Sequence, residues 1–129
     1  SMTSHLNKKI EESYDLRELM PYINKIDTDS LWSKKIPTMV KSYFSEMYEL
    51  LENIFDYLIE NGHCVIIVGN SAYGNIVIPT DEILKKIAKR IGFKKTIIQK
   101  ARMLGTSSQQ YKKIDRPDLL RESLIFLQK

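Results

Sequence analysis

The sequence predicts a single α/β domain. Apolar residues recur every three or four positions over residues 37–61, as on one face of a helix. An apolar run at 64–68, rich in β-branched residues and bounded by Gly62 and Gly69, indicates a strand. A second helical pattern begins at Thr80, and alternation of helices with strands is typical of the α/β class. With 129 residues, the chain is long enough for one domain and too short for two.

The N-terminal part of the chain has the least regular pattern. We expect an irregular, partly helical segment over residues 1–36, followed by the α/β domain over 37–129. Asp15 is a suitable cap for a short helix in this segment. Residues 1–2 are interpreted as the remnant of an expression tag and are left out of the fold.

The pattern over 37–61 predicts a long amphipathic helix. Pro37 suits its first turn, because the missing N–H would have no partner there in any case. Asn61 and Gly62 are expected to end it, since glycine tolerates the left-handed cap conformation. Its apolar face consists of Met39, Val40, Tyr43, Phe44, Met47, Leu50, Leu51, Ile54, Phe55, Leu58 and Ile59.

The run at 64–68 has five consecutive apolar residues and no alternation with polar ones. Such a run predicts a strand buried on both faces, as in a parallel sheet. Residues 69–74 are expected to form a loop at the carboxyl end of this strand, which is where open α/β sheets bind their ligands.

The remaining elements are a helix and two strands. Thr80 is a suitable N-cap, and Asp81 follows it in the first turn, where acids interact favourably with the helix dipole. Gly92 is expected to end this helix. Short apolar runs at 96–98 and 124–127 predict two strands, so the expected order is helix–strand–helix–strand–strand.

Composition restricts the classes of function. A formal charge of +4 and a pI near 9.1 are compatible with a polyanionic partner but are common in soluble proteins. The single cysteine, Cys64, excludes an internal disulfide, and the two histidines do not make a zinc site. No apolar run approaches the ~20 residues that span a bilayer, so we expect a cytoplasmic protein without membrane contact.

Several segments together carry a resemblance to a known family. In combination they resemble the C-terminal part of the DNA methyltransferases that act on the exocyclic amino group of adenine or cytosine. The resemblance extends over roughly residues 38–129 and implies the C-terminal half of a Rossmann-like methyltransferase fold, which ends in an antiparallel hairpin. The segments are IIVGNS at 66–71, IPTD at 78–81, GF at 92–93, TSSQQY at 106–111 and RESLIFLQK at 121–129.

Two motifs of that family are absent. The (Asp/Asn/Ser)-Pro-Pro-(Tyr/Trp) motif, which holds the target amine, needs adjacent prolines, and no two of the four prolines here are adjacent. The glycine-containing motif for S-adenosylmethionine is also missing, and residues 69–74 cannot replace it because they follow what matches the fifth strand. The resemblance therefore implies a truncated gene product or one part of a split enzyme. We expect this chain alone to have no catalytic residue, to be inactive and to bind no cofactor, although the complete enzyme would use S-adenosylmethionine.

Asn70 and Ser71 are candidate site residues, because they follow the strand that would lie beside the catalytic loop of a complete fold. Their side chains could orient that loop or a substrate group. The alternative is that they cap the turn and bind its backbone.

The connection between the last two strands supplies the other candidates, because in this family it lies against the flipped base. Tyr111 could stack on a base there, and polar side chains could reach a base edge or a phosphate. A polar loop without such a role is the alternative. The polar candidates are Thr106, Ser107, Gln109 and Gln110. The cations that could contact DNA phosphates are Arg102, Lys112, Lys113 and Arg116.

The expected partners follow from the missing half. The strand at 64–68 would have one edge without a partner in this chain, and such an edge is prone to pair with another polypeptide. We therefore expect a homo-oligomer, or a complex with a separate chain that carries the N-terminal half, acting on DNA. Two alternatives remain open: a non-catalytic DNA-binding or regulatory module, and a foldable remnant without a function of its own.

Overall fold

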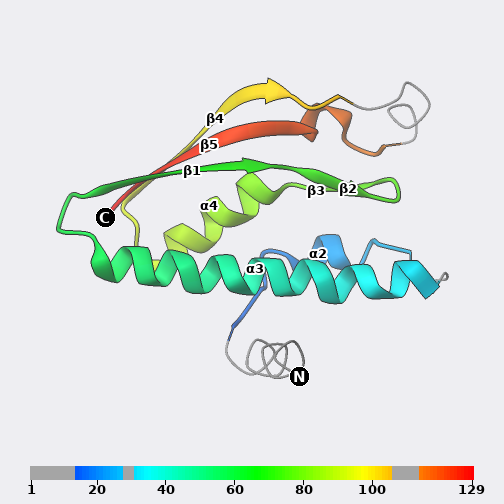
Figure 1. Ribbon diagram of the computed structural model, residues 1–129, viewed down its shortest axis with the longest axis horizontal. Helices are drawn as coiled ribbons and strands as arrows, with labels where there is room; N and C mark the ends of the chain where they lie inside the picture. Colours follow the sequence, from blue (N-terminus) through cyan, green and yellow to red (C-terminus); the bar gives the residue numbers. More distant parts are fainter. Residues whose placement is uncertain (1–13, 28–30, 106–113) are drawn as a thin grey trace.

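The computed structural model describes residues 14–27, 31–105 and 114–129, with residues 31–33 described by their backbone alone. It confirms the mixed α/β class, with helices gathered below an antiparallel sheet (Figure 1). The elements are α2 (Met20–Ile23), α3 (Leu31–Tyr57), β1 (His63–Gly69), β2 (Ser71–Tyr73), β3 (Ile76–Ile78), α4 (Thr80–Ile91), β4 (Lys95–Met103), the 3₁₀ helix η1 (Pro117–Leu119) and β5 (Arg121–Gln128).

Helix α3 begins earlier than the sequence predicted, and Pro37 lies inside it rather than in its first turn. The reason is that Ile36 belongs to the buried face: Ile36, Val40 and Phe44 recur at helical spacing and all lie in the core. Burial of this extra turn outweighs the hydrogen bond that proline cannot donate. The helix ends at Tyr57, before the stop expected at Asn61 and Gly62. The left-handed conformation occurs in the turn that follows, at Asn61, with φ 65°.

The three main strands lie in the order β1–β5–β4. Strand β5 is antiparallel to both neighbours, so β1 and β4 run parallel to each other on either side of it. The register places Ile66 and Ile98 opposite Ile125 in one row across the sheet. The last two strands thus form the expected antiparallel pair.

Both long helices lie on the same side of the sheet (Figure 1). Helix α4 contacts all three main strands, and α3 packs against α4. Leu19 and Ile23 of the N-terminal segment join the same core, so residues 14–27 also lie on the helical side. The largest buried apolar side chains of this core are Leu19, Phe44, Leu51, Ile78, Ile83, Leu84, Ile87, Ile125 and Leu127.

The opposite face of the sheet is exposed, which corrects the expectation that the strand at 64–68 is buried on both faces. Burial alternates along β1, and the side chains of Ile67 and Ile97 are 65% and 57% exposed. Val65 and Phe126 share this face, because Val65 and Ile97 both pair with Phe126. No described element covers these residues. The continuous apolar run of β1 therefore supplies core side chains to the helical side of the sheet and an apolar surface to the opposite side.

The two outer strands differ in charge. Strand β1 contains no acidic, lysine or arginine side chain. Strand β4 carries Lys95, Lys100 and Arg102, and its pairing with β5 is interrupted by a register shift between Lys100 and Arg102. Charged side chains and bulges are the devices that prevent an edge strand from pairing further, so β4 is protected and β1 is not.

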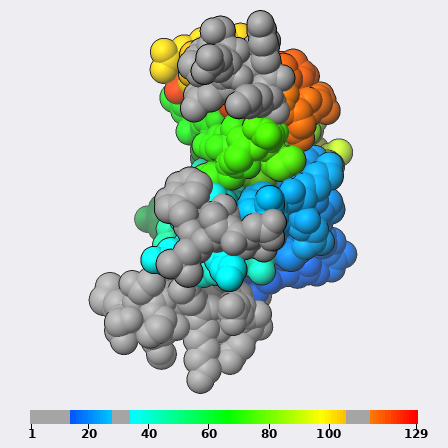
Figure 2. All heavy atoms as spheres, turned by 90° about the vertical axis from the view of Figure 1, so that its right-hand side faces the viewer, coloured from blue at the N-terminus to red at the C-terminus, as the bar shows by residue number. Residues whose placement is uncertain are grey.

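A short hairpin replaces the loop expected at 69–74. Strands β2 and β3 pair antiparallel, with Tyr73 opposite Ile76 and a two-residue connection between them. Gly74 has φ 62° there, a conformation that glycine adopts without strain. Figure 2 shows the hairpin in green, between the blue N-terminal segment and the orange segment that precedes β5. Its apolar contacts with that segment are made by Val77, Leu119, Leu120, Ala72 and Ile114.

Candidate functional site

Asn70 follows β1 at the carboxyl end of the strand, and its side chain is buried. The amide Nδ2 donates to Asp81 Oδ1 over 3.1 Å and to the carbonyl oxygen of Leu119 over 2.9 Å. Its Oδ1 accepts the backbone N–H of Asp81 over 3.0 Å. The side chain thus joins the end of β1 to α4 and to the segment before β5, instead of binding only its own turn.

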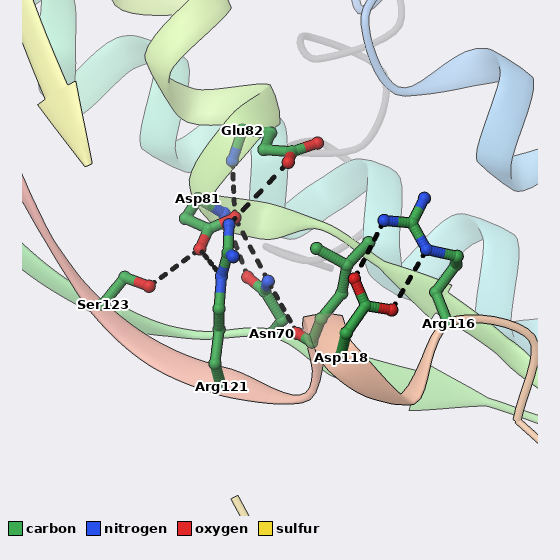
Figure 3. A network of polar contacts seen from close by, with 8 residues as sticks. Asn70, Asp81, Glu82, Arg116, Asp118, Arg121 and Ser123 are labelled. Carbon is green, nitrogen blue, oxygen red and sulfur yellow. Dashed lines mark hydrogen bonds and ion pairs between the residues drawn. The ribbon is translucent and has the colours of Figure 1, made fainter. Parts of the chain in front are cut away.

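Asp81 lies at the centre of these contacts and is completely buried. Arg121 Nε and Ser123 Oγ each donate to its Oδ2 over 2.8 Å. The N–H of Glu82 donates to Oδ1 over 2.7 Å. Figure 3 shows the donors converging on this carboxylate from Asn70, which follows β1, and from α4 and β5. We refer to Asn70, Asp81, Arg121 and Ser123 as the Asp81 network.

Opposing effects act on the pKa of Asp81. Burial raises it, because the charged form loses hydration, whereas the hydrogen bonds from Arg121, Ser123 and Asn70 and the charge of Arg121 lower it. Together the lowering effects prevail, so the pKa lies below its ordinary value and Asp81 is ionised at neutral pH. A fully paired carboxylate of low pKa is a weak base. The network therefore positions the backbone around the site and does not supply acid–base chemistry.

A cavity of about 310 Å³ lies beside the network, between α3, the end of β1 and the hairpin. Its aromatic and apolar walls include Met39, Tyr43, Phe44 and Tyr73, and its hydroxyl-bearing residues include Ser71 and Thr80. Tyr43 was expected in the core as part of the apolar face of the helix, yet its side chain is 41% exposed. Burial and the neighbouring Tyr73 both raise the pKa of Tyr43. We refer to this space as the tyrosine cavity.

The structure separates the candidate residues. Asn70 lies in the Asp81 network and Ser71 lines the tyrosine cavity. Of the proposed phosphate contacts, Arg102 is paired with Glu122 at 3.2 Å and Arg116 with Asp118 at 3.0 Å, and all four side chains keep contact with solvent. The other candidates lie outside the described residues: Thr106, Ser107, Gln109, Gln110, Tyr111, Lys112 and Lys113.

The described residues offer neither a metal cluster nor an activated nucleophile. No group of three or more histidine, cysteine or acidic side chains among them could hold a metal ion. Burial raises the pKa of the Cys64 thiol, which disfavours the nucleophilic thiolate. In the described part of the chain, no helix combines the length and the apolar character that crossing a membrane would require.

The sequence interpretation missed Asp81, Arg121 and Ser123 as a unit. Asp81 was assigned only to the helix dipole, because its partners lie 11, 40 and 42 positions away in the sequence. The available signal was the pair of motifs IPTD and RES, each of which places a charged residue within three positions of an apolar run. The polar side chains there satisfy one another, as burial requires.

Comparison of the chain with protein-family models, with curated proteins and with solved structures gave no match.

Proposed function

We propose that this chain is the C-terminal portion of a DNA methyltransferase that acts on the exocyclic amino group of adenine or cytosine. The observation that carries the proposal is the convergence of three segments of the resemblance on one carboxylate. IIVGNS supplies Asn70, IPTD supplies Asp81, and RESLIFLQK supplies Arg121 and Ser123. Segments that resemble one family and also meet in one buried network behave as a single structural unit.

The arrangement of the strands supports the same proposal. A reversed strand, β5, lies between the parallel strands β1 and β4. The resemblance implies a final antiparallel hairpin added to a sheet of parallel strands, in which β1 would be the next strand inward. The finer assignment to the Rossmann-like methyltransferase fold is part of this proposal.

The missing half explains the exposed surfaces. The uncharged edge of β1 and the apolar face around Ile67 are where further strands and covering helices would pack. In the complete enzyme, that half would bind S-adenosylmethionine and carry the Pro-Pro-Tyr loop. It could be a separate chain. Arg102 and Arg116, near the connection between β4 and β5, would contact the DNA phosphates. Lys112 and Lys113 belong to the same proposal but lie outside the described residues.

The test reunites the two halves. The second polypeptide is the N-terminal half of an amino-methyltransferase, cut before its counterpart of α3. The present chain is assayed alone, in a mixture with that half, and as a fusion to it. Each sample receives tritiated S-adenosylmethionine and DNA. We expect transfer only where both halves are present, with N6-methyladenine or N4-methylcytosine in the digested DNA. Asp81→Ala in the fused protein should abolish the transfer, because it releases the elements that meet at the site.

The chain alone also distinguishes the alternatives. Calorimetric titration with S-adenosylmethionine should show no binding in the micromolar range. Micromolar binding would contradict the proposed division between the halves. Salt-dependent DNA binding without methyl transfer in any combination would favour a non-catalytic DNA-binding module.

A further inference from the structure

A second row of apolar side chains runs along α3 outside the core. Four large side chains share it and are between 41% and 93% exposed. Because each residue advances about 100° around an α-helix, their positions fall within about 40° of arc. Tyrosine and methionine are enriched at protein interfaces, and a row with this spacing is typical of a helix that packs against another helix. The residues are Met39, Tyr43, Leu50 and Tyr57, which we call the outer row.

The outer edge of β1 carries backbone groups without a partner among the described strands. The N–H of Asn70 donates to the carbonyl oxygen of Arg121, and hydrogen bonds alternate along an antiparallel pair, so the even-numbered residues of β1 bond to β5. The N–H and C=O groups of Val65 and Ile67 therefore point to the side where no described strand lies. Unpaired groups of this kind form a template for one more strand.

The outer row lies next to β1, and the midpoints of the two are level. Strand β1 runs back antiparallel to α3 (Figure 1). At one end, Tyr43 and Gly69 line the tyrosine cavity together, and at the other a short connection joins α3 to β1. Leu50 is the midpoint between the two tyrosines of the outer row, and Ile66 is the midpoint of β1. One twofold axis can thus pass close to both residues.

The pattern of β1 matches itself about such an axis. Ile66 would face Ile66 of a second copy, and Val65 would face Ile67 of that copy. The outward N–H and C=O groups of Val65 and Ile67 then bond to each other, as in an antiparallel pair. Strand β1 has no lysine, arginine or acidic side chain, so no like charges of these kinds oppose each other across the pair.

The outer row matches itself about the same axis. Leu50 would meet Leu50 of the second copy, and Tyr43 would meet Tyr57, because the two tyrosines are equally distant from Leu50 in the sequence. Glu46 borders the row and would lie beside Ile54 of the second copy, so this acid does not oppose its own counterpart. A surface that matches itself about one axis is the requirement for an isologous dimer.

We propose that two copies of this chain form a twofold dimer through the edge of β1 and the outer row. Strand β1 pairs antiparallel with its counterpart and joins two three-stranded sheets into one, while the α3 helices pack antiparallel beside the joint. The inference rests on the symmetry of these two rows and not on the proposed function. The N-terminal half of that proposal would need the same edge, so it and the second copy would exclude each other.

Reciprocal charges test the contact at Leu50. Leu50→Lys and Leu50→Glu each place like charges together at the axis and should weaken the dimer by about tenfold or more. An equimolar mixture of the two variants should restore it, as dimers with one chain of each kind. Glu52→Lys is the control, since Glu52 lies on another side of α3, near Tyr14, and the variant should dimerise as the wild type does. Sedimentation equilibrium from micromolar to millimolar concentration measures the association, and thermal melts verify that each variant is folded.

Hydrogen exchange tests the pairing of β1. The amide protons of Val65 and Ile67 should exchange more slowly as the protein concentration increases, because they become hydrogen-bonded only in the dimer. The amide of Ile66 is the internal control, since its bond to β5 protects it at every concentration. In Leu50→Glu the dependence on concentration at Val65 and Ile67 should disappear.

Three results would overturn the inference. The first is a wild-type chain that stays monomeric at millimolar concentration. The second is a dimer that Leu50→Lys and Leu50→Glu leave intact. The third is exchange at Val65 and Ile67 that does not depend on protein concentration although a dimer forms. None of these measurements involves DNA or methyl transfer, so this inference and the proposed function can fail separately.

Discussion

The two faces of the same sheet have opposite environments, although adjacent residues supply them. Along β5, Arg121, Ser123 and Ile125 point to the helical side, where they are paired or buried. Glu122 and Phe126 point to the other side, which no described element covers. Both faces are rich in apolar side chains, so hydrophobicity alone does not distinguish core from surface here. The two faces differ in whether helices of the same chain pack against them.

Removing an ion pair should change the free energy of unfolding much more on the helical face of the sheet than on the opposite face. Asp81→Ala removes the acceptor for Arg121 and Ser123 inside the core and should lower the free energy of unfolding by about 3–5 kcal/mol. Glu122→Ala breaks the exposed pair with Arg102 and should cost less than about 1 kcal/mol. Urea unfolding measures both values. Equal losses would mean that the second face is covered in solution.

The apolar residues provide the next comparison. Ile125→Ala leaves a cavity in the core and should cost about 2–5 kcal/mol. Phe126→Ala, one position later, removes a side chain that is partly exposed and should cost about 1 kcal/mol or less in the isolated chain. Urea unfolding of the two variants measures both free energies. In a complex with the N-terminal half that we propose, the cost of Phe126→Ala should increase, because the side chain would then be buried.

Low pH should weaken the Asp81 network on the helical side of the sheet. Because the folded-state pKa of Asp81 is lowered, its stabilising contribution is complete above the ordinary carboxyl pKa and is lost as the pH falls through the lower folded value. The free energy of unfolding should therefore decrease below about pH 4. In Asp81→Asn this component of the pH dependence should be absent. If the free energy of unfolding of Asp81→Asn decreases at low pH as much as that of the wild type, other carboxyl groups cause the decrease.

The smallest effect on stability is expected on the open face. Ile67→Lys places a charge on an exposed position and should change the free energy of unfolding by no more than about 0.5 kcal/mol. It should also reduce self-association in analytical ultracentrifugation, because it interrupts the apolar surface. Lys95→Ala, at the protected edge, is the control. If the wild type is monomeric at every concentration, self-association is excluded and a separate partner chain remains.

The sequence predicted the parts of the fold that depend on local periodicity. Helices α3 and α4, strand β1 and the antiparallel pair of β4 and β5 all occur where expected, with shifted bounds. The hairpin β2–β3 was missed because each strand has three residues, although the Gly74–Asn75 pair is a known hairpin signal. Periodicity also misplaced Tyr43, since the apolar face of α3 is wider than the core that covers it.

The candidate site was predicted only in its location. The carboxyl end of β1 was identified from the order of the elements, and Asn70 lies there in the Asp81 network. Its partners could not be found from spacing, because Arg121 approaches Asp81 only after β5 is inserted between β1 and β4. Tertiary contacts of this kind depend on topology, which local patterns do not contain.

The contrast between the outer strands limits how copies of this chain can assemble. Growth of a ribbon by edge pairing needs two receptive edges on every molecule, one for the copy before and one for the copy after. Here Lys95, Lys100 and Arg102 and the interrupted register occupy one of the two. Pairing through β1 would consequently join two molecules edge to edge and then stop, as in a closed twofold dimer. Among the described residues, a single unprotected edge would therefore favour a closed dimer over a growing ribbon.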